Sequence, residues 1–252
     1  EHFRMTRSRY FSLILILGSL TALSPFSIDM YLPGFPAIAK DLATSVSRVS
    51  LSLSGFFIGI SAGQLIYGPL LDRFGRKKPL YAGLTVYILA SVCCALSHDI
   101  TSLIVLRFIQ ALGSCAATVT AVTLVRDLFP VNENAKVFAL LMLVLGASPM
   151  IAPTVGGYIT SAFGWHVVFI VLAILCLIIF LSCIRWLPTA YRPDHSLSLK
   201  PGPIIRSFWS VFTEPQFYTY CFTGGIAFTG LFAYVAGSPV VFMNVYGVGQ
   251  KA

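Results

Sequence analysis

The sequence predicts an all-α protein that crosses a membrane several times. Apolar residues make up 57% of its 252 residues and charged residues only 10%, with a mean hydropathy of +0.84. A helix needs about 20 consecutive apolar residues to cross the hydrocarbon core of a bilayer. Seven stretches of about this length lack a run of charges, at roughly 11–32, 49–71, 79–97, 102–125, 137–161, 166–187 and 216–243.

The first apolar stretch is predicted to be a membrane helix and not a cleaved signal peptide. It is too long for a signal peptide, and it ends in Asp29, Pro33 and Pro36 where a cleavage site would have small residues. The next five stretches follow through short connections. We therefore expect residues 1–187 to form one compact six-helix unit.

The connection after the sixth stretch differs in composition from the earlier ones. Residues 188–215 hold five prolines and mixed charge, with one amphipathic segment over Ile204–Phe212. This composition is typical of a linker that carries an interfacial helix. Six helices, a linker and one further helix (216–252) indicate a six-plus-six architecture of which the chain holds part. A start at Glu1, with Met5 as a candidate initiator, supports the same expectation.

The distribution of basic residues predicts the orientation in the membrane. Thirteen lysines and arginines lie in the N-terminal tail and alternate connections, against Lys40, Arg48 and Lys251 on the other side. Positive connections remain in the cytoplasm, so the N-terminus and the 188–215 linker are predicted to be cytoplasmic. The net charge of +8 is thus a topology signal and does not indicate nucleic-acid binding.

The sequence gives no sign of an enzyme, a metal site or a cofactor. All six cysteines lie in apolar stretches without C-x-x-C spacing, which favours simple packing. The chain contains neither HExxH nor GxSxG, and no paired aspartates lie within its apolar stretches.

The turn between the second and third stretches combines charge with glycine. Its pattern is Gly68-x-x-x-Asp72-Arg73-x-Gly75-Arg76-Lys77. A cytoplasmic anchoring cluster is one interpretation, but the glycine and aspartate spacing resembles the signature loop of the major facilitator superfamily. The resemblance implies two six-helix halves. It also implies that Asp72 caps a helix of the other half and that Arg76 pairs with Asp127, forming a latch that breaks when the cytoplasmic side opens.

Two ionisable residues lie inside the predicted spans. Asp29 is in the first and Arg107 in the fourth, about 5 Å and 8 Å from the outer ends of their helices. Charges inside a membrane are costly, so each marks a candidate functional site. We expect the two to neutralise each other and to couple proton and substrate movement, although a static structural pair is the alternative. Tyr31 and Gln110 are candidates for lining a substrate cavity.

The fifth stretch carries small and kinking residues at helical spacing. They recur every three or four positions, so they share one face, where they permit close helix packing. The run also resembles the antiporter motif of drug exporters, with alanine at the first glycine of its Gly-Pro-x-x-Gly-Gly core. The candidate residues are Gly146, Pro149, Pro153, Gly156 and Gly157.

Together these segments resemble the Bcr/CflA group of bacterial drug:proton antiporters. The resemblance implies a multidrug efflux transporter of the bacterial inner membrane, monomeric when full length, that exports hydrophobic drugs in exchange for protons by alternating access. A metabolite or amino-acid exporter or symporter of the same fold is the alternative. The 252 residues alone are expected to be inactive in transport.

Overall fold

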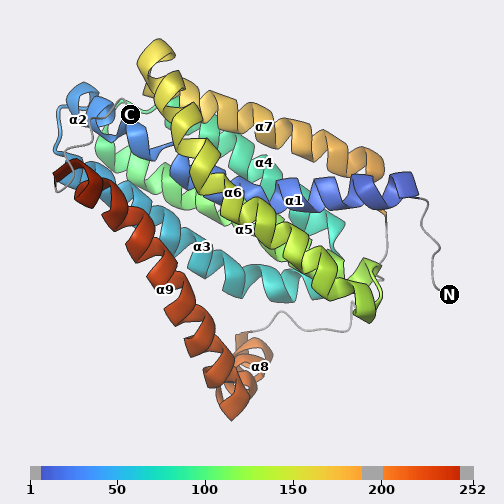
Figure 1. Cartoon of the computed structure of the whole chain (residues 1–252). Helices are drawn as coiled ribbons and strands as arrows, with labels where there is room; N and C mark the ends of the chain where they lie inside the picture. The colour runs from blue at the N-terminus through green and yellow to red at the C-terminus, as the bar shows by residue number, and fades with distance from the viewer. Residues whose placement is uncertain (1–6, 189–200, 245–252) are drawn as a thin grey trace. The chain divides into compact units, whose positions relative to one another are not determined.

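The computed structural model describes residues 7–188 and 201–244, and in those residues it contains helices and no strand. The predicted all-α fold class is therefore confirmed. The elements are α1 (Arg7–Asp29), η1 (Leu32–Gly34), α2 (Phe35–Asp41), α3 (Val46–Phe74), α4 (Lys77–Ala95), α5 (Ile100–Leu128), α6 (Val131–Phe163), α7 (Trp165–Trp186), α8 (Pro201–Phe212) and α9 (Pro215–Asn244) (Figure 1).

Six of the helical segments in the described residues are long and apolar enough to cross a membrane. They are α3 to α7 and the segment Arg9–Asp41, which joins α1 to α2. These helices coincide with the first six predicted stretches, so the chain is a multi-pass membrane protein. The seventh stretch forms α9, a helix of 30 residues, and its passage across the membrane stays a prediction.

Side-chain caps and glycines fix where several helices begin and end. Ser45 accepts a hydrogen bond from the Arg48 amide at the start of α3, and Asp99 accepts one from the Ser102 amide at the start of α5. The hydrogen bonds from Ser102 hold the pKa of the Asp99 carboxyl below its ordinary value. Gly75, after α3, has a φ of +80°, a backbone conformation that side chains disfavour.

Glycines also bring neighbouring helices into close contact. A Cβ atom on Gly59 of α3 would lie 2.6 Å from the Phe108 carbonyl oxygen of α5, and one on Gly63 would lie 2.7 Å from the Cβ of Cys115. On the other side of α5, a Cβ on Gly113 would lie 2.6 Å from the Tyr87 amide nitrogen of α4. α5 therefore packs backbone-to-backbone between α3 and α4, as small residues allow in membrane helices.

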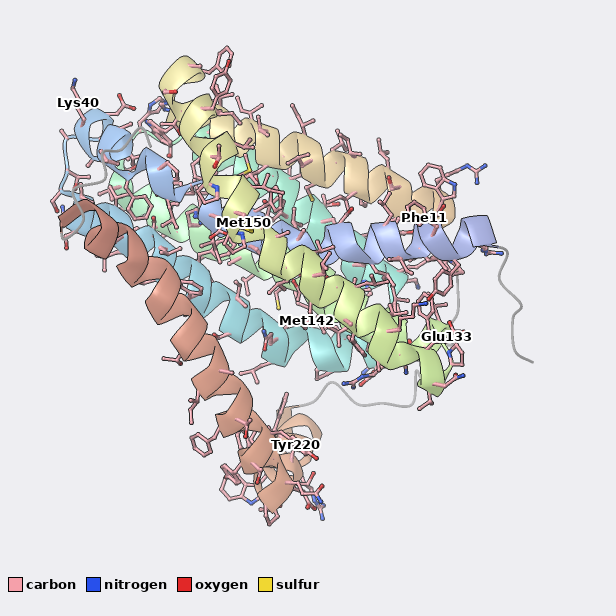
Figure 2. The ribbon with its side chains drawn as sticks, in the orientation of Figure 1. Phe11, Lys40, Glu133, Met142, Met150 and Tyr220 are labelled. Carbon is pink, nitrogen blue, oxygen red and sulfur yellow. The ribbon has the colours of Figure 1, made fainter. Side chains whose placement is uncertain are left out.

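Apolar side chains cover much of the surface of this bundle. On α6, Met142 and Met150 (labelled in Figure 2) are 53% and 78% exposed. Broad exposed apolar surface is unusual for a protein in water but is expected for helices in contact with lipid or another membrane helix.

The chain divides into two compact units, Glu1–Leu197 and Ser198–Ala252. In the second unit, α8 includes the predicted amphipathic segment and places Ile205, Phe208, Trp209 and Phe212 on one face by their helical spacing. The rings of Phe212 and Phe217 meet edge to face at 5.3 Å, where α8 turns into α9. Residues 189–200 of the predicted linker lie outside the described residues.

Candidate functional site

The turn between α3 and α4 forms a compact ionic cluster. The Arg76 guanidinium donates from Nε to Asp127 Oδ2 at 2.7 Å and from Nη1 to Asp72 Oδ1 at 2.9 Å. The Arg76–Asp127 contact expected from the resemblance is therefore present. The contact with Asp72, four residues earlier in the chain, was not foreseen. We call the end of the bundle with this turn the charged end, and the end with α2 and Gly164 the far end.

Partial burial makes this cluster stronger than an ordinary surface ion pair. The Arg76 side chain is 8% exposed and that of Asp127 19% exposed. Burial by itself lowers the pKa of Arg76, but its hydrogen bonds to Asp127 and Asp72 outweigh this effect and raise the pKa above its ordinary value. The cluster therefore keeps Arg76 charged and ties the start of α4 to the end of α5.

The other two residues of this loop are placed differently. The guanidinium carbon of Arg73 lies 5.7 Å from the centre of the Phe74 ring, and its buried Nε has no hydrogen-bond partner in the described residues. A Cβ on Gly68 would meet nothing within 4 Å in this part of the protein. Packing within the described residues therefore does not explain the glycine at position 68.

Arg107 lies at the centre of the bundle in a cage of aromatic rings. Its side chain is fully buried, and its guanidinium carbon lies 4.2 Å from the Phe56 ring centre, 4.5 Å from that of Tyr31 and 5.7 Å from that of Phe169. The electron-rich ring faces attract a cation. The cage draws on α3, α7 and the segment after α1, so it joins parts of the chain that are far apart in sequence.

Hydrogen bonds complete the environment of Arg107. Its Nη1 donates to Gln110 Oε1 at 2.6 Å, and its Nη2 donates to the Ser27 carbonyl oxygen of α1 at 3.0 Å. The Gln110 amide nitrogen in turn donates to the Ser91 hydroxyl of α4 at 2.7 Å. Both predicted cavity residues thus contact Arg107, Gln110 by this hydrogen bond and Tyr31 through its ring.

Asp29 is the last residue of α1 and lies against α6. It is 8% exposed, and its Oδ2 accepts a hydrogen bond from the Ser148 hydroxyl at 3.5 Å. The next residue, Met30, presents its carbonyl to Gly156 of α6, where a Cβ would lie only 2.1 Å from the oxygen. The carboxylate is therefore enclosed where the end of α1 packs against α6.

The predicted ion pair between Asp29 and Arg107 is wrong. Among the described residues, the ion pairs within 4 Å are Arg76 with Asp72, Arg76 with Asp127, and His166 with Asp41. Arg107 reaches α1 at Ser27, two residues before Asp29, and two residues on an α-helix are separated by about 200° around its axis. The two charged groups therefore have separate partners, the Ser27 carbonyl oxygen and Gln110 for Arg107 and the Ser148 hydroxyl for Asp29.

The antiporter-like residues of α6 divide into two groups. Gly156 meets the α1 backbone at Met30, and a Cβ on Gly157 would lie 3.7 Å from Pro33. A Cβ on Gly146 would meet nothing within 4 Å in the described residues, so the close approach to the segment after α1 lies at the C-terminal part of this motif. Pro149 and Pro153 lie within one continuous helix and follow Ser148, the residue of α6 that contacts Asp29.

Sequence reasoning did not place Phe56 and Phe169 around Arg107, and it missed the hydroxyl partner Ser148. The chain has 20 phenylalanines, and nothing in the local sequence distinguishes the two that face Arg107. Ser148 lies inside the recognised motif, but only the packing of α6 against α1 places it beside Asp29.

Six apolar helices around a buried polar cluster define the class of protein as a multi-pass membrane protein. A family model, the Major Facilitator Superfamily, matches residues 17–252. The chain therefore belongs to the Major Facilitator Superfamily, whose members are transporters and not enzymes.

Named relatives give the same family. An uncharacterized MFS-type transporter of Bacillus subtilis (strain 168), YdgK, is 41% identical over 246 residues, which cover 95% of this chain and 60% of that protein. A bicyclomycin resistance protein homolog of Haemophilus influenzae is 35% identical over 238 residues, covering 94% of this chain and 60% of that protein. The chain thus spans about 60% of the length of these relatives.

A solved structure supports the fold independently. It is the crystal structure of a bacterial homolog of the human lysosomal transporter Spinster, in an inward-facing and unoccupied conformation. The TM-score is 0.64 at 18% sequence identity, and the match covers 97% of this chain and 57% of the other. At this identity the similarity concerns the fold alone.

Proposed function

We propose that the full-length gene product exports hydrophobic drugs across the bacterial inner membrane in exchange for protons. The observation that carries this proposal is the Asp29 carboxylate, 8% exposed and enclosed between α1 and α6. A charged carboxylate in a membrane segment is costly, and binding a proton is one way to remove its charge. Among the described residues no cation lies within 4 Å of it to do so instead.

Because Asp29 and Arg107 do not form an ion pair, we assign the two residues different roles. Arg107 has its own partners, so Asp29 can exchange a proton without leaving an unpaired arginine. We assign Arg107 to holding α1, α3, α5 and α7 around the binding region, through its rings and its Ser27 contact. Tyr31 and Gln110, which touch Arg107, would face the substrate when the two halves separate.

Alternating access supplies the movement in this proposal. The Arg76–Asp127 contact would hold the charged end closed and break when that end opens to the cytoplasm. Gly68, Asp72, Arg73 and Gly75 complete this latch in the proposal. The close approach of α6 to Met30 at Gly156 would transmit a change at Asp29 to the packing of α1 against α6.

Drug export is favoured over other cargo by two lines of support. The Haemophilus influenzae relative is named for bicyclomycin resistance, and residues 146–157 resemble the antiporter motif of drug exporters. The distribution of lysine and arginine supports a cytoplasmic N-terminus. We further propose that the full-length transporter is a monomer, is driven by protons and requires no cofactor.

Drug accumulation in cells tests the proposal. The full-length gene product is expressed in a drug-hypersensitive bacterium, and accumulation of bicyclomycin and chloramphenicol is followed with and without an uncoupler. The proposal predicts lower accumulation than in cells with empty vector and loss of the difference on uncoupling. Accumulation equal to the empty vector for a panel of hydrophobic drugs would reject drug export. Uptake of a metabolite driven by an inward proton gradient would favour a symporter.

A further inference from the structure

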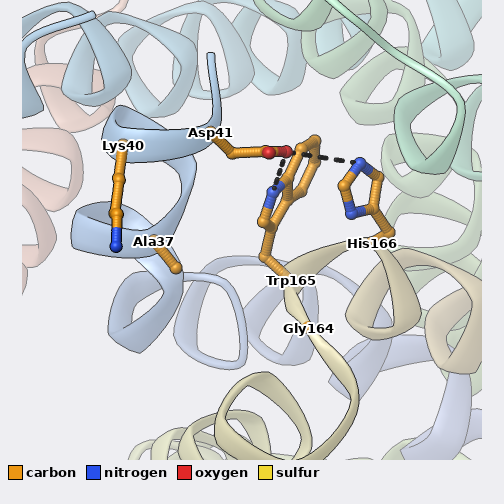
Figure 3. Close-up of a pocket in the computed structure, with 6 residues that line it drawn as sticks. All are labelled: Ala37, Lys40, Asp41, Gly164, Trp165 and His166. Carbon is orange, nitrogen blue, oxygen red and sulfur yellow. Dashed lines mark hydrogen bonds and ion pairs between the residues drawn. The ribbon is translucent and has the colours of Figure 1, made fainter. Parts of the chain in front are cut away.

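A second cluster of ionisable and aromatic groups lies at the far end of the bundle. Asp41 ends α2, and Trp165 and His166 begin α7 after the turn at Gly164. The Trp165 indole donates from Nε1 to Asp41 Oδ2 at 3.0 Å, and His166 Nε2 lies 3.7 Å from the same oxygen (Figure 3). The Trp165 and His166 rings are stacked, with centroids 3.7 Å apart.

The three side chains line one open cavity together with three further residues. The cavity has a volume of about 450 Å³, and Ala37, Lys40 and Gly164 complete its lining. Among the described residues that line this cavity, Lys40, Asp41 and His166 are ionisable, and the Lys40 side chain points away from the other two (Figure 3). Gly164 has a φ of +89°, so the turn that presents Trp165 and His166 depends on a glycine conformation.

The contacts of Asp41 differ in how they respond to protons. The Trp165 indole N–H does not titrate, so its hydrogen bond to the Asp41 carboxylate needs no change of protonation on the tryptophan. The imidazole attracts the carboxylate only when it is protonated, and imidazole ordinarily changes charge between about pH 5 and 8.

We propose that His166, Asp41 and Trp165 form a second proton-binding site, at the far end of the bundle and separate from Asp29. Proton binding at His166 strengthens the contact between α2 and α7. α2 follows Asp29 through η1, and α7 directly follows α6, which packs on Asp29.

Trp165 itself provides the readout, because a protonated imidazole stacked on an indole quenches its fluorescence. The chain has three tryptophans, so Trp186→Phe and Trp209→Phe leave Trp165 as the sole emitter. The purified protein in nanodiscs is titrated from pH 8 to pH 5. We expect one quenching transition, and we expect His166→Gln to remove it. Circular dichroism confirms that each variant is folded.

The Asp41→Asn variant tests the carboxylate, since it retains an acceptor for the indole but loses the charge. Asp41 and His166 are 54% and 39% exposed, so their attraction is that of an exposed pair. The same transition should then need about 1.4- to 5-fold more protons. Asp99→Asn, a carboxylate outside this cavity, is the matched control and should leave the transition in place. A transition that survives His166→Gln, or that Asp41→Asn does not move, would overturn the proposal, whatever the transport activity.

Discussion

Replacing Gly156 by alanine should destabilise the protein, because this position is where α6 meets the α1 backbone. An alanine Cβ would lie 2.1 Å from the Met30 carbonyl oxygen and 2.7 Å from the Met30 Cα and carbonyl carbon. Ordinary contacts of a Cβ begin at 3.4 Å, so the two segments would have to separate by about 1 Å. The obstructing atoms belong to the backbone, so no change of rotamer can relieve the clash.

The size of the effect follows from two opposing contributions. Forcing extra volume into a packed interior costs about 1–3 kcal/mol, and alanine recovers up to about 1 kcal/mol through its higher helix propensity than glycine. We therefore expect a net loss of about 1–2 kcal/mol. Gly146→Ala is the matched control on the same helix, since a Cβ there would meet nothing within 4 Å in the described residues.

The assay is thermal unfolding of both variants in the same detergent. The helix-propensity gain is common to both, so the difference between them isolates the contact with Met30. Gly156→Ala should melt below the wild type and Gly146→Ala at or above it. Equal melting temperatures for the two variants would refute the close contact between α1 and α6, and with it the enclosure of Asp29.

Three further predictions concern the other contacts. A double-mutant cycle of Arg76→Gln and Asp127→Asn should give a coupling free energy of about 1 kcal/mol in unfolding measurements, and additive effects would show that the pair contributes nothing. Arg107→Lys should lower stability by about 1–3 kcal/mol, because one ammonium cannot donate to both Gln110 and Ser27 from the same cage, and a wild-type melting curve would contradict this. Asp99→Ala should lower the melting temperature at pH 7. The pKa of Asp99 is lower in the folded protein than in the unfolded chain, so its carboxylate stabilises the fold above the unfolded-state pKa and loses this effect as the pH falls through the folded-state pKa. The difference in melting temperature between the wild type and Asp99→Ala should therefore shrink in strong acid. An equally large difference in strong acid would contradict this prediction.

The fold was predictable from the sequence because its signals are local. Each membrane helix corresponds to an apolar run of about 20 residues with at most one charge, and the loop after α3 combines a glycine turn with charges at recognisable spacing. The Arg76–Asp127 contact was expected from the resemblance of this loop to the signature loop of the superfamily, and the structure contains it. Depth along a helix and the side of the membrane can be counted from the sequence.

The partners of the buried charges were not predictable in the same way. Equal depth suggested an Asp29–Arg107 pair, but pairing also requires that the two groups face each other around the helix axis. That rotation depends on how α1 packs against α5 and α6, which no short segment encodes. The aromatic cage of Arg107 and the Ser148 contact of Asp29 arise from this packing. The far-end cluster of Asp41 and His166 joins residues more than 100 positions apart for the same reason.

The most direct test of the central claim is drug-driven proton movement at Asp29. The full-length gene product is reconstituted into liposomes that contain a pH-sensitive dye, and drug efflux is started by an imposed pH gradient. We predict that wild-type protein dissipates the gradient faster when drug is present. Asp29→Asn should abolish this drug-dependent flux, while Asp99→Asn, a carboxylate outside the membrane helices, retains it. Drug-dependent proton flux of wild-type size in Asp29→Asn would contradict the assignment of proton exchange to this carboxylate.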